Sequence, residues 1–414
     1  ILPGNAPCII SKEKLTLPKV FKSAGYNTAV IGKWHLGLGE GNLDWNKEIN
    51  HTPNDVGFDY SFIFPATNDR VPCVYIENRR VKGLDPDDPI EVSYTDECPY
   101  DDIVTATKNP ELLRMRHSHG HDQSIVNGIG RIGYMRGGRD ALWRDEDLAE
   151  DFLDKVKDFI SANNKNPFFI YYALHQPHVP RVPNPRFVGA SGLGPRGDVI
   201  AELDWCVGEL VSHLDAEGLL EDTIIIFSSD NGPVLDDGYL DDSPRLNRAC
   251  RHKPAGPLRG GKYSKFEGGA RVPLIVSWAS HIKPQTSSAL VSQVDFVASF
   301  ASMLGVDLDD WAPDSLDMID VLLGKSHIGR EEIFAEDLAK SHFLRQGKWT
   351  YLQPHEGIAI NYHTDTELGT SLDPQLYNME YDIGQRENVA QWHMDIVEKM
   401  DKRIQEIKAG KRTR

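Results

Sequence analysis

Polar side chains that could do chemistry follow two apolar runs of this sequence at short spacing. Lys33 and His35 come directly after the run at residues 28–31, inside the sequence Gly-Lys-Trp-His-Leu-Gly. His178 ends a His-Gln-Pro-His sequence that follows a second run at residues 168–174. Ammonium and imidazole groups can neutralise charge that develops on an oxyanion, and a histidine can protonate a leaving oxygen. Each histidine could equally be a buried structural residue, so the set gains its meaning from occurring together.

A third apolar run, at residues 223–227, leads into Asp230 and Asn231, and a glycine-rich loop further on contains Lys262. Asp and Asn offer the hard oxygen atoms that Ca²⁺ and Mg²⁺ prefer, although Asp-Asn-Gly is also a common turn sequence. A second lysine would add positive charge around the same oxyanion, although a lysine in such a loop is often only solvated. Together these groups predict transfer of a sulfuryl or a phosphoryl group, and their spacing does not separate the two reactions.

Four further residues are candidates for contact with a substrate. Arg70, His117, His119 and Arg181 lie in polar loops, and arginine and histidine suit the hydroxyl, carboxylate and sulfate groups of a sulfated sugar. They could equally brace long loops, and the His-Ser-His-Gly-His sequence at residues 117–121 could be plain surface. Both interpretations remain open at this point.

The elements that would position these residues alternate between short strands and amphipathic helices. Helices are predicted over residues 17–24, 146–160 and 199–214, and strands over residues 28–31, 168–174, 223–227 and 272–278. Such alternation is typical of a largely parallel sheet with helices on both faces. Ligands of such α/β folds bind beyond the carboxyl ends of the strands, so we expect the polar segments to meet at one site.

The predicted organisation is a catalytic domain at residues 1–330 and a smaller C-terminal subdomain at residues 331–414. Residues 35–145 are rich in Asn, Asp, Pro, Gly and Arg, which indicates long loops over the edge of the sheet. The C-terminal region contains strand-like pieces at residues 348–352 and 375–378 and ends in an amphipathic helix. We therefore expect an α+β subdomain with a short antiparallel sheet.

Composition bounds the class of protein. The chain has 414 residues, of which 40% are hydrophobic and 26% charged, as in an ordinary globular protein with a sizeable core. Its formal net charge of -17 argues against nucleic acid or an anionic membrane as the partner, although a local basic pocket could still hold a small anion. No run approaches the ~20 apolar residues of a membrane span, and no signal peptide is visible. The five cysteines are too widely spaced to indicate a zinc site.

The motifs together resemble the type I, formylglycine-dependent sulfatases of the alkaline-phosphatase superfamily. The sequence from Gly25 to Gly37 matches the family's second signature at nearly every position, and the segment around Asp230 matches its metal-binding segment. The catalytic-histidine, lysine-loop and C-terminal segments of the family are matched at residues 175–180, 260–273 and 376–390. The resemblance implies an alkaline-phosphatase-like α/β fold, in which a mainly parallel sheet is sandwiched by helices and followed by a smaller α+β subdomain.

The resemblance also implies a sulfuric ester hydrolase that removes sulfate from a carbohydrate or aryl sulfate ester. In that family the Asp-Asn pair would ligate Ca²⁺, and Lys33 and Lys262 would hold the sulfate oxygens. His178 would help to protonate the leaving oxygen, and His35 would hold the nucleophile or the sulfate. The expected substrate is a sulfated small molecule or glycan, and the expected location is periplasmic or secreted.

One departure from the family concerns its nucleophile. The formylglycine is made from the Cys or Ser of a C/S-x-P-x-R motif, and no such motif occurs in this sequence; Cys8 lies in Pro-Cys-Ile-Ile-Ser, which lacks both the proline and the arginine. The upstream Asp-Asp pair that completes the family's calcium site is absent as well. We therefore expect an N-terminally truncated sulfatase sequence that has only part of the calcium ligands and is inactive, or nearly so, as given.

Two other functions remain open. A phosphonate or phosphodiester hydrolase of the same superfamily would share the metal and nucleophile architecture. A non-catalytic glycan-binding pseudoenzyme would have lost its nucleophile, although such a protein has less need of the complete set of lysines and histidines.

Overall fold

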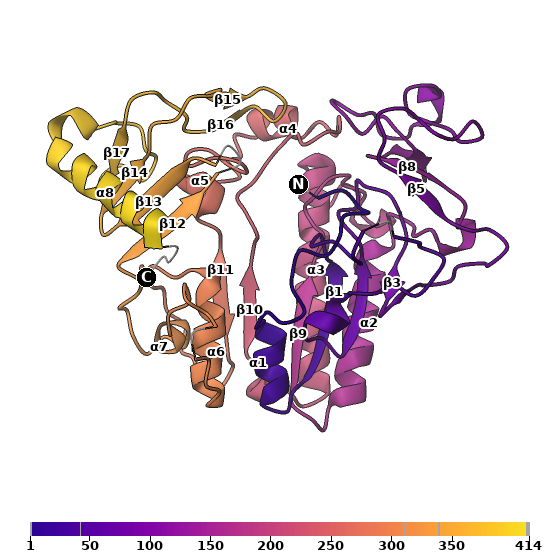
Figure 1. Ribbon diagram of the computed structural model, residues 1–414, viewed down its shortest axis with the longest axis horizontal. Coiled ribbons are helices and arrows are strands. Elements are labelled where there is room, and N and C mark those ends of the chain that lie inside the picture. The colour runs from indigo at the N-terminus through magenta and orange to yellow at the C-terminus, as the bar shows by residue number, and fades with distance from the viewer. Residues whose placement is uncertain (1, 42, 310, 338–339, 411–414) are drawn as a thin grey trace. The chain divides into compact units, whose positions relative to one another are not determined.

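The computed structural model describes residues 2–41, 43–309, 311–337 and 340–410. The chain forms two compact units, of which unit 1 comprises Ile1–Leu220 and Asp236–Cys250, and unit 2 comprises Glu221–Leu235 and Arg251–Arg414. Both are drawn in Figure 1. The units are defined by contacts between residues, and the predicted domain boundary after residue 330 stays a prediction.

Unit 1 contains a five-stranded sheet in the order β4-β3-β2-β1-β9 (Figure 1). The strands are β1 (Asn27–Lys33), β2 (Tyr60–Phe64), β3 (Ile76–Glu77), β4 (Arg80–Val81) and β9 (Phe168–Ala173). Strand β1 pairs in parallel with both β2 and β9, while β3 and β4 run antiparallel to their neighbours. Because the register aligns Lys33 with Phe64 and Gly32 with Ala173, the three parallel strands end at one edge of the sheet.

The sequence of β1 explains its place inside this sheet. Residues 28–32 are all buried, and a continuous run of small and β-branched residues is what a strand covered on both faces requires. Helices α1 (Leu17–Ser23) and α2 (Leu148–Asn163) both contact β1. The buried face of α2 includes Phe152, Val156 and Ile160, which recur at helical spacing.

The described part of unit 1 also contains two small ribbons, two further helices and several short 3-10 turns. The ribbons pair β5 (Glu91–Ser93) with β8 (Tyr134–Arg136) and β6 (Ile125–Val126) with β7 (Ile129–Gly130), both antiparallel. Helix α3 (Gly194–Ala216) packs against α2 and against α4 (Ser243–Ala249). The segment predicted as long loops therefore contains short strands, of which β2, β3 and β4 belong to the main sheet.

Unit 2 contains antiparallel sheets. Strands β10 (Ile225–Ser228) and β11 (Leu274–Ser277) form one pair, and β15 (Ile360–Asn361) and β16 (Thr366–Glu367) form another. A four-stranded sheet has the order β12-β13-β14-β17, with β12 (Glu332–Glu336), β13 (His342–Gln346), β14 (Trp349–Leu352) and β17 (Gln375–Asn378). The helices are α5 (Glu267–Ala270), α6 (Phe296–Leu304), α7 (Ile319–Leu322) and α8 (Met394–Gly410).

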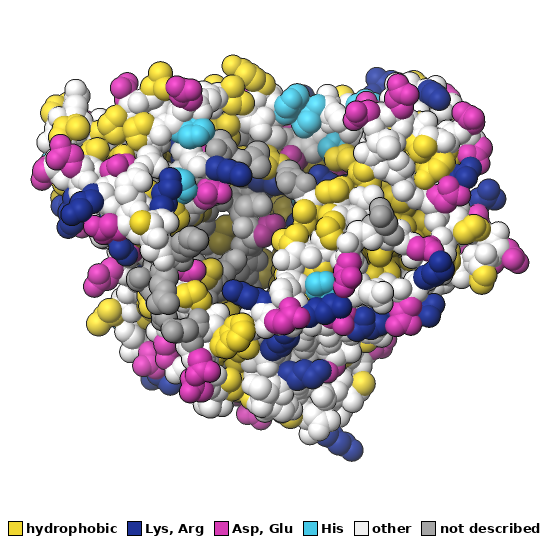
Figure 2. All heavy atoms as spheres, viewed as in Figure 1, with side chains coloured by type: hydrophobic (Ala, Val, Ile, Leu, Met, Phe, Trp, Pro, Cys, Tyr) yellow, Lys and Arg dark blue, Asp and Glu magenta, His cyan; other side chains and the backbone are white. Residues whose placement is uncertain are grey.

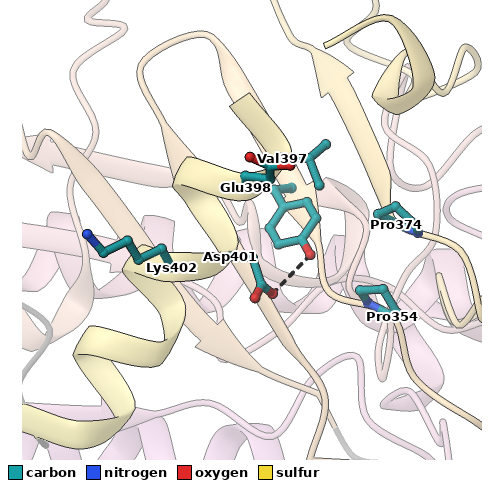
Figure 3. Close-up of a pocket in the computed structure, with 7 residues that line it drawn as sticks. Pro354, Pro374, Val397, Glu398, Asp401 and Lys402 are labelled. Carbon is teal, nitrogen blue, oxygen red and sulfur yellow. Dashed lines mark hydrogen bonds between the residues drawn. The ribbon is translucent and has the colours of Figure 1, made fainter. Parts of the chain in front are cut away.

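Helix α8 covers the four-stranded sheet. Its apolar stripe buries Val397, Met400 and Ile404 in a cluster that includes Leu344 and Leu376 of the sheet. A shallow hollow of about 400 Å³ lies beside this helix. Asp401 lies at this hollow (Figure 3). Its carboxylate accepts a hydrogen bond from the Tyr351 hydroxyl at 3.1 Å. None of the residues predicted to do chemistry lines this hollow.

The predicted strands and helices are confirmed, with shifts of a few residues at their ends. One difference concerns the strands predicted at residues 223–227 and 272–278, which we expected in the parallel sheet. They correspond to β10 and β11, which pair with each other in an antiparallel manner within unit 2. The residues of both strands are half-buried or exposed, and their facing backbone groups pair with one another.

The structure also bears on the surface and the cysteines. All five cysteines are free thiols. Acidic and basic side chains are interspersed on the face shown in Figure 2. Among the described residues, no helix is both long enough and apolar enough to cross a membrane.

Candidate active site

The end of β1 carries the first two candidate catalytic residues. Lys33 is the last residue of the strand, and His35 follows two positions later. The backbone N–H of Trp34 donates to the carbonyl of Phe64 at 3.2 Å, and the N–H of His35 donates to the carbonyl of Pro65 at 3.1 Å. The chain after β1 is therefore held against the chain after β2 by main-chain hydrogen bonds.

The turn after β1 has a special backbone. His35 has a φ of 53°, a left-handed conformation that residues with a side chain rarely adopt. Gly37 has a φ of 76°, and a Cβ atom there would lie 2.0 Å from the carbonyl oxygen of Pro7. The ring of Trp34 is buried, and its Nε1 donates to the carbonyl of Gly37 at 2.7 Å. Trp34 therefore packs inward, and Gly37 is required by the close approach of the chain.

His35 is a neutral group in this setting. Its Nε2 lies 3.2 Å from the carbonyl oxygen of Leu2. A carbonyl can only accept, so Nε2 carries the proton and Nδ1 is the acceptor. Burial, followed by the positive charges of Lys33 and Arg70, lowers the pKa of His35 to about 4. At neutral pH His35 can therefore position a group by a hydrogen bond, but it contributes no charge.

A buried carboxylate follows β2. Asp69 is 3% exposed, and its two oxygens receive Arg70 Nη1 at 2.8 Å and His121 Nε2 at 2.9 Å. The hydroxyl of Thr67 also donates to this carboxylate. Burial alone would raise the pKa of Asp69, but Arg70 and the hydrogen bond from His121 hold it well below its usual value. Asp69 is therefore ionised and fixes the Arg70 guanidinium beside His35.

His121 connects the histidine-rich loop to this cluster. Its Nδ1 lies 2.9 Å from the carbonyl oxygen of His119, while Nε2 faces Asp69. Both ring nitrogens thus face oxygen atoms, which fixes the orientation of the ring. A Cβ atom at Gly238 would lie 2.0 Å from this ring. The imidazole therefore occupies a closely fitted position.

The other predicted substrate-binding residues have structural contacts. The hydroxyl of Ser118 donates to Asp236 at 2.6 Å and lies 3.0 Å from the His119 ring. His117 belongs to a loop that bridges to residue Tyr239, and among the described residues its buried Nδ1 has no hydrogen-bond partner. Arg181 forms a buried ion pair with Asp241 at 2.7 Å. These contacts brace loops, and a role of the same residues in substrate binding stays a prediction.

The end of β9 adds two histidines that have different environments. His175 packs against the rings of Phe64 and Phe152, and burial lowers its pKa to about 3, so it is a neutral core residue. His178 donates from Nδ1 to the carbonyl of Val179 at 2.7 Å, so a proton for a leaving oxygen would be carried on Nε2. The positive charge of His178 also contributes to the low pKa of Asp69, so His178 lies close to Asp69.

Three candidates lie in unit 2, where the metal segment and the lysine loop are packed together. The backbone N–H of Gly232, next to Asn231, donates to the carbonyl of Gly269 at 2.9 Å, and the N–H of Lys262 donates to the carbonyl of Pro233 at 3.0 Å. A Cβ atom at Gly232 would lie 1.7 Å from a carbonyl oxygen of the loop. The glycines of both segments therefore permit the close approach that brings Lys262 towards the Asp-Asn pair.

The fit of these residues to Ca²⁺ is incomplete. Asp230 offers a carboxylate, and Asn231 offers its Oδ1 while its Nδ2 donates to the carbonyl of Gly232 at 2.9 Å. Ca²⁺ takes about six to eight oxygen ligands. In the described parts of the chain, no group of three or more His, Cys, Asp or Glu residues is arranged to hold a metal ion. The pair does not form a Ca²⁺ site by itself, and the Ca²⁺ expectation stays a prediction.

Unit 1 thus brings together residues from the ends of three parallel strands, namely Lys33, His35, Arg70 and His178. The sequence points to the polar segment that contains Asp69 and Arg70 and to the histidine sequence at residues 117–121, whereas Thr67 and the way in which Asp69 holds Arg70 and His121 come from the structure. A signal for this strand end was present, because the apolar run of β2 is followed by the polar sequence Thr-Asn-Asp-Arg at residues 67–70. That run lies in the segment assigned to loops, so its strand end was overlooked.

Comparisons with known proteins agree with this architecture. The family model described as Sulfatase matches residues 9–306. An N-acetylgalactosamine-6-O-sulfatase of Bacteroides thetaiotaomicron is 47% identical over 410 residues, which cover 99% of this chain and 80% of that protein. Human arylsulfatase A is 27% identical over 91% of this chain and 67% of its own length. A solved 6S-sulfatase structure from work on glycosaminoglycan metabolism by Bacteroides thetaiotaomicron superposes with a TM-score of 0.96 at 46% identity, covering 99% of this chain and 85% of that one.

The family match covers most of the chain, and the 47% identical relative is aligned over nearly all of it. The segments that provide Lys33, His35, His178, Asp230 and Lys262 all lie inside the matched range. The chain therefore belongs to the sulfatase family, whose members are sulfuric ester hydrolases with an alkaline-phosphatase-like fold.

Proposed function

We propose that this protein acts on the 6-O-sulfate of N-acetylgalactosamine in a sulfated glycan. The observation that supports it most directly is the 47% identity, over nearly the whole chain, to a bacterial sulfatase named for that sugar position. The same relative favours a sulfate ester over a phosphonate or phosphodiester as the substrate.

The residues of this chain suit the two tasks that sulfate transfer sets. Lys33 would bind the sulfate oxygens as a cation, and Arg70, fixed by Asp69, would add positive charge on the same side of unit 1. For Lys262, which belongs to unit 2, a role in sulfate binding stays a prediction from the family resemblance. His35 would orient the sulfate or the attacking group through a neutral hydrogen bond. His178 would deliver a proton from Nε2 to the leaving sugar oxygen.

The nucleophile is a separate part of the proposal. The family's C/S-x-P-x-R motif is not among these 414 residues. We propose that the chain as given binds the sulfated sugar but releases inorganic sulfate from it very slowly or not at all. Sulfate release by the purified chain at the rate of a full sulfatase would overturn this part and leave the binding proposal intact.

Calorimetric titration with N-acetylgalactosamine 6-sulfate tests the binding proposal. Replacing Lys33 with Ala should weaken binding roughly 10- to 100-fold, because a charged hydrogen bond contributes about 1.5–3 kcal/mol. The matched control is Lys47→Ala, because that side chain is 79% exposed and is paired only at the surface. Equal affinity for the unsulfated sugar and its 6-sulfate would contradict the proposal, and so would tighter binding of an aryl phosphodiester than of the sulfate ester.

We also propose a periplasmic or secreted location, as in the family this chain belongs to. Cell fractionation of the producing organism, with antibodies against this chain, would test it. Recovery of the protein in the cytoplasmic fraction alone would refute it.

A further inference from the structure

An arginine lies in the first turn of α3 with its side chain buried and its Nε atom without a hydrogen-bond partner among the described residues. Arg196 is 6% exposed. No residue within the described ranges accepts a hydrogen bond from its Nε atom. Buried arginines are normally paired, because removing a guanidinium from water costs several kcal/mol unless an anion compensates for it.

The charged neighbours of Arg196 do not compensate for its charge. Its electrostatic partners are Arg181 and Asp241, and Asp241 is already bound by Arg181 at 2.7 Å. Arg181 also donates to the hydroxyl of Ser243 at 3.1 Å. Burial, followed by the repulsion from Arg181, lowers the pKa of Arg196 to about 10, so the group is still charged at neutral pH. Two guanidinium groups thus share one carboxylate.

The backbone at this place adds to the positive potential. Arg196 is the third residue of a 23-residue helix, and the first turn of a long helix presents unpaired N–H groups and a partial positive charge. Helix N-termini commonly bind anions for this reason. The helix end alone would not indicate a site, but here it coincides with a buried cation that shares its one carboxylate with a second arginine.

This cluster adjoins the segment of the catalytic histidine. The Nε of Arg181 donates to the carbonyl of Pro177 at 3.0 Å, and His178 is the next residue. Arg196, Arg181 and His178 therefore belong to one continuous region of unit 1. An anion held by Arg196 would lie next to the sugar rather than at a remote surface.

We propose that Arg196, at the N-terminus of α3 and beside Arg181, forms a subsite for a second oxyanion of the substrate. That oxyanion would be a carboxylate of a neighbouring uronic acid or a second sulfate ester, because both present the paired oxygens that a guanidinium fork binds. The inference rests on the proposed function and extends it, since it makes the preferred substrate a glycan with at least two anionic groups.

The test compares three ligands by calorimetric titration. They are N-acetylgalactosamine 6-sulfate, the 4,6-disulfate of the same sugar, and a disaccharide in which the 6-sulfated sugar is linked to a uronic acid. Wild-type protein should bind one of the two dianionic ligands at least about tenfold more tightly than the monosulfate. Which of the two is preferred identifies the second oxyanion as a sulfate or a carboxylate.

Replacing Arg196 with Met separates a ligand-binding role from a structural one. Met fills similar volume without a charge, so Arg196→Met should abolish the preference for the dianionic ligand and raise the Tm of the free protein. Arg196→Lys keeps the charge but loses the fork, and it should retain only part of the preference. Arg245→Met is the control, because Arg245 lies on neighbouring α4 with its side chain 65% exposed, and it should change neither quantity.

Two results would overturn the inference. One is equal affinity of the wild-type protein for all three ligands, and the other is a preference that persists in Arg196→Met while its Tm falls. If Arg196→Met does not fold, Arg196→Lys with an unchanged preference has the same meaning. Failure of the proposed function is distinguishable, because then N-acetylgalactosamine 6-sulfate itself would not bind in a manner that depends on Lys33.

Discussion

Replacing Asp69 with Asn should be among the most destabilising conservative changes in unit 1. The carboxylate of Asp69 is buried, and its two oxygens receive hydrogen bonds from Arg70 Nη1 at 2.8 Å and His121 Nε2 at 2.9 Å. Asn has nearly the same shape but only one acceptor oxygen, and its NH₂ group must then face one of the two donors. The change therefore removes a charge and also creates a donor–donor contact.

The magnitude follows from the burial of all three groups. The side chains of Arg70 and His121 are 12% and 7% exposed, so water replaces the lost carboxylate poorly. Breaking a buried ion pair by removing one partner costs about 3–5 kcal/mol. That is a large share of the 5–15 kcal/mol by which folded domains are usually stable. We expect Asp69→Asn to lower the free energy of unfolding by about 3–5 kcal/mol at pH 7.

Urea unfolding at several pH values provides the assay and a second check. The pKa of Asp69 is depressed in the folded protein, so its contribution is fully present above the unfolded pKa near 4 and is lost as pH falls towards the lower folded value. The difference between wild type and Asp69→Asn should be constant from about pH 5 to 7 and should shrink below about pH 4. Asp242→Asn, at an exposed ion pair with Arg245, is the control that should leave stability unchanged.

The interpretation of Asp69 would be wrong if Asp69→Asn lost less than about 1 kcal/mol, or if its difference from wild type did not depend on pH below 4. A large loss of stability without any loss of affinity for N-acetylgalactosamine 6-sulfate would contradict the proposal that Asp69 holds Arg70 for binding. It would show that Arg70 does not need Asp69 in order to contribute to the site.

Two further changes test the packing behind the site. Burial lowers the pKa of His175 to about 3, so wild-type protein should lose stability as pH falls from about 6.5 towards 3. In urea titrations at pH 4.5, His175→Leu should remove roughly 2–3 kcal/mol of that loss. Equal acid sensitivity of the two proteins would refute this. Gly238 has a φ of 118°, and Gly238→Ala would place a methyl group 2.0 Å from the His121 ring. The change should therefore lower both the Tm and the affinity for the 6-sulfated sugar. An unchanged Tm would show that the ring can move aside.

The strand ends of β1 and β9 could be predicted from the sequence because the signal is local. Both runs are apolar and four or more residues long, and each is followed at once by lysine or histidine. The parallel pairing of these strands then places Lys33, His35 and His178 at one edge, as expected for an α/β sheet. The inward packing of Trp34 follows from the alternation of side chains along the strand.

The partners of Asp69 could not be predicted in this way. Asp69 and His121 are 52 residues apart in the chain, and no local sequence pattern around either residue predicts their contact. Strand β2 was overlooked because its run is short and lies within a polar segment, where local composition favoured loops. The left-handed φ of His35 was equally hidden, because that conformation is imposed by contacts of the chain after β1 with the residues after β2.

The two kinds of support in unit 1 assign different tasks to its residues. Lys33 and His35 are positioned by strand pairing and main-chain hydrogen bonds, which substitutions of distant side chains do not remove. Arg70, Arg181 and His121 each contact a buried carboxylate through their side chains, so their positions depend on side-chain partners as well as on the backbone. Binding of the sulfate by Lys33 and His35 should therefore persist when the neighbouring ion pairs are substituted, because each of those pairs can be substituted separately. Selectivity for what surrounds the sulfate ester is then expected to depend on the arginines and their carboxylates, and the bond-breaking geometry on the strand ends.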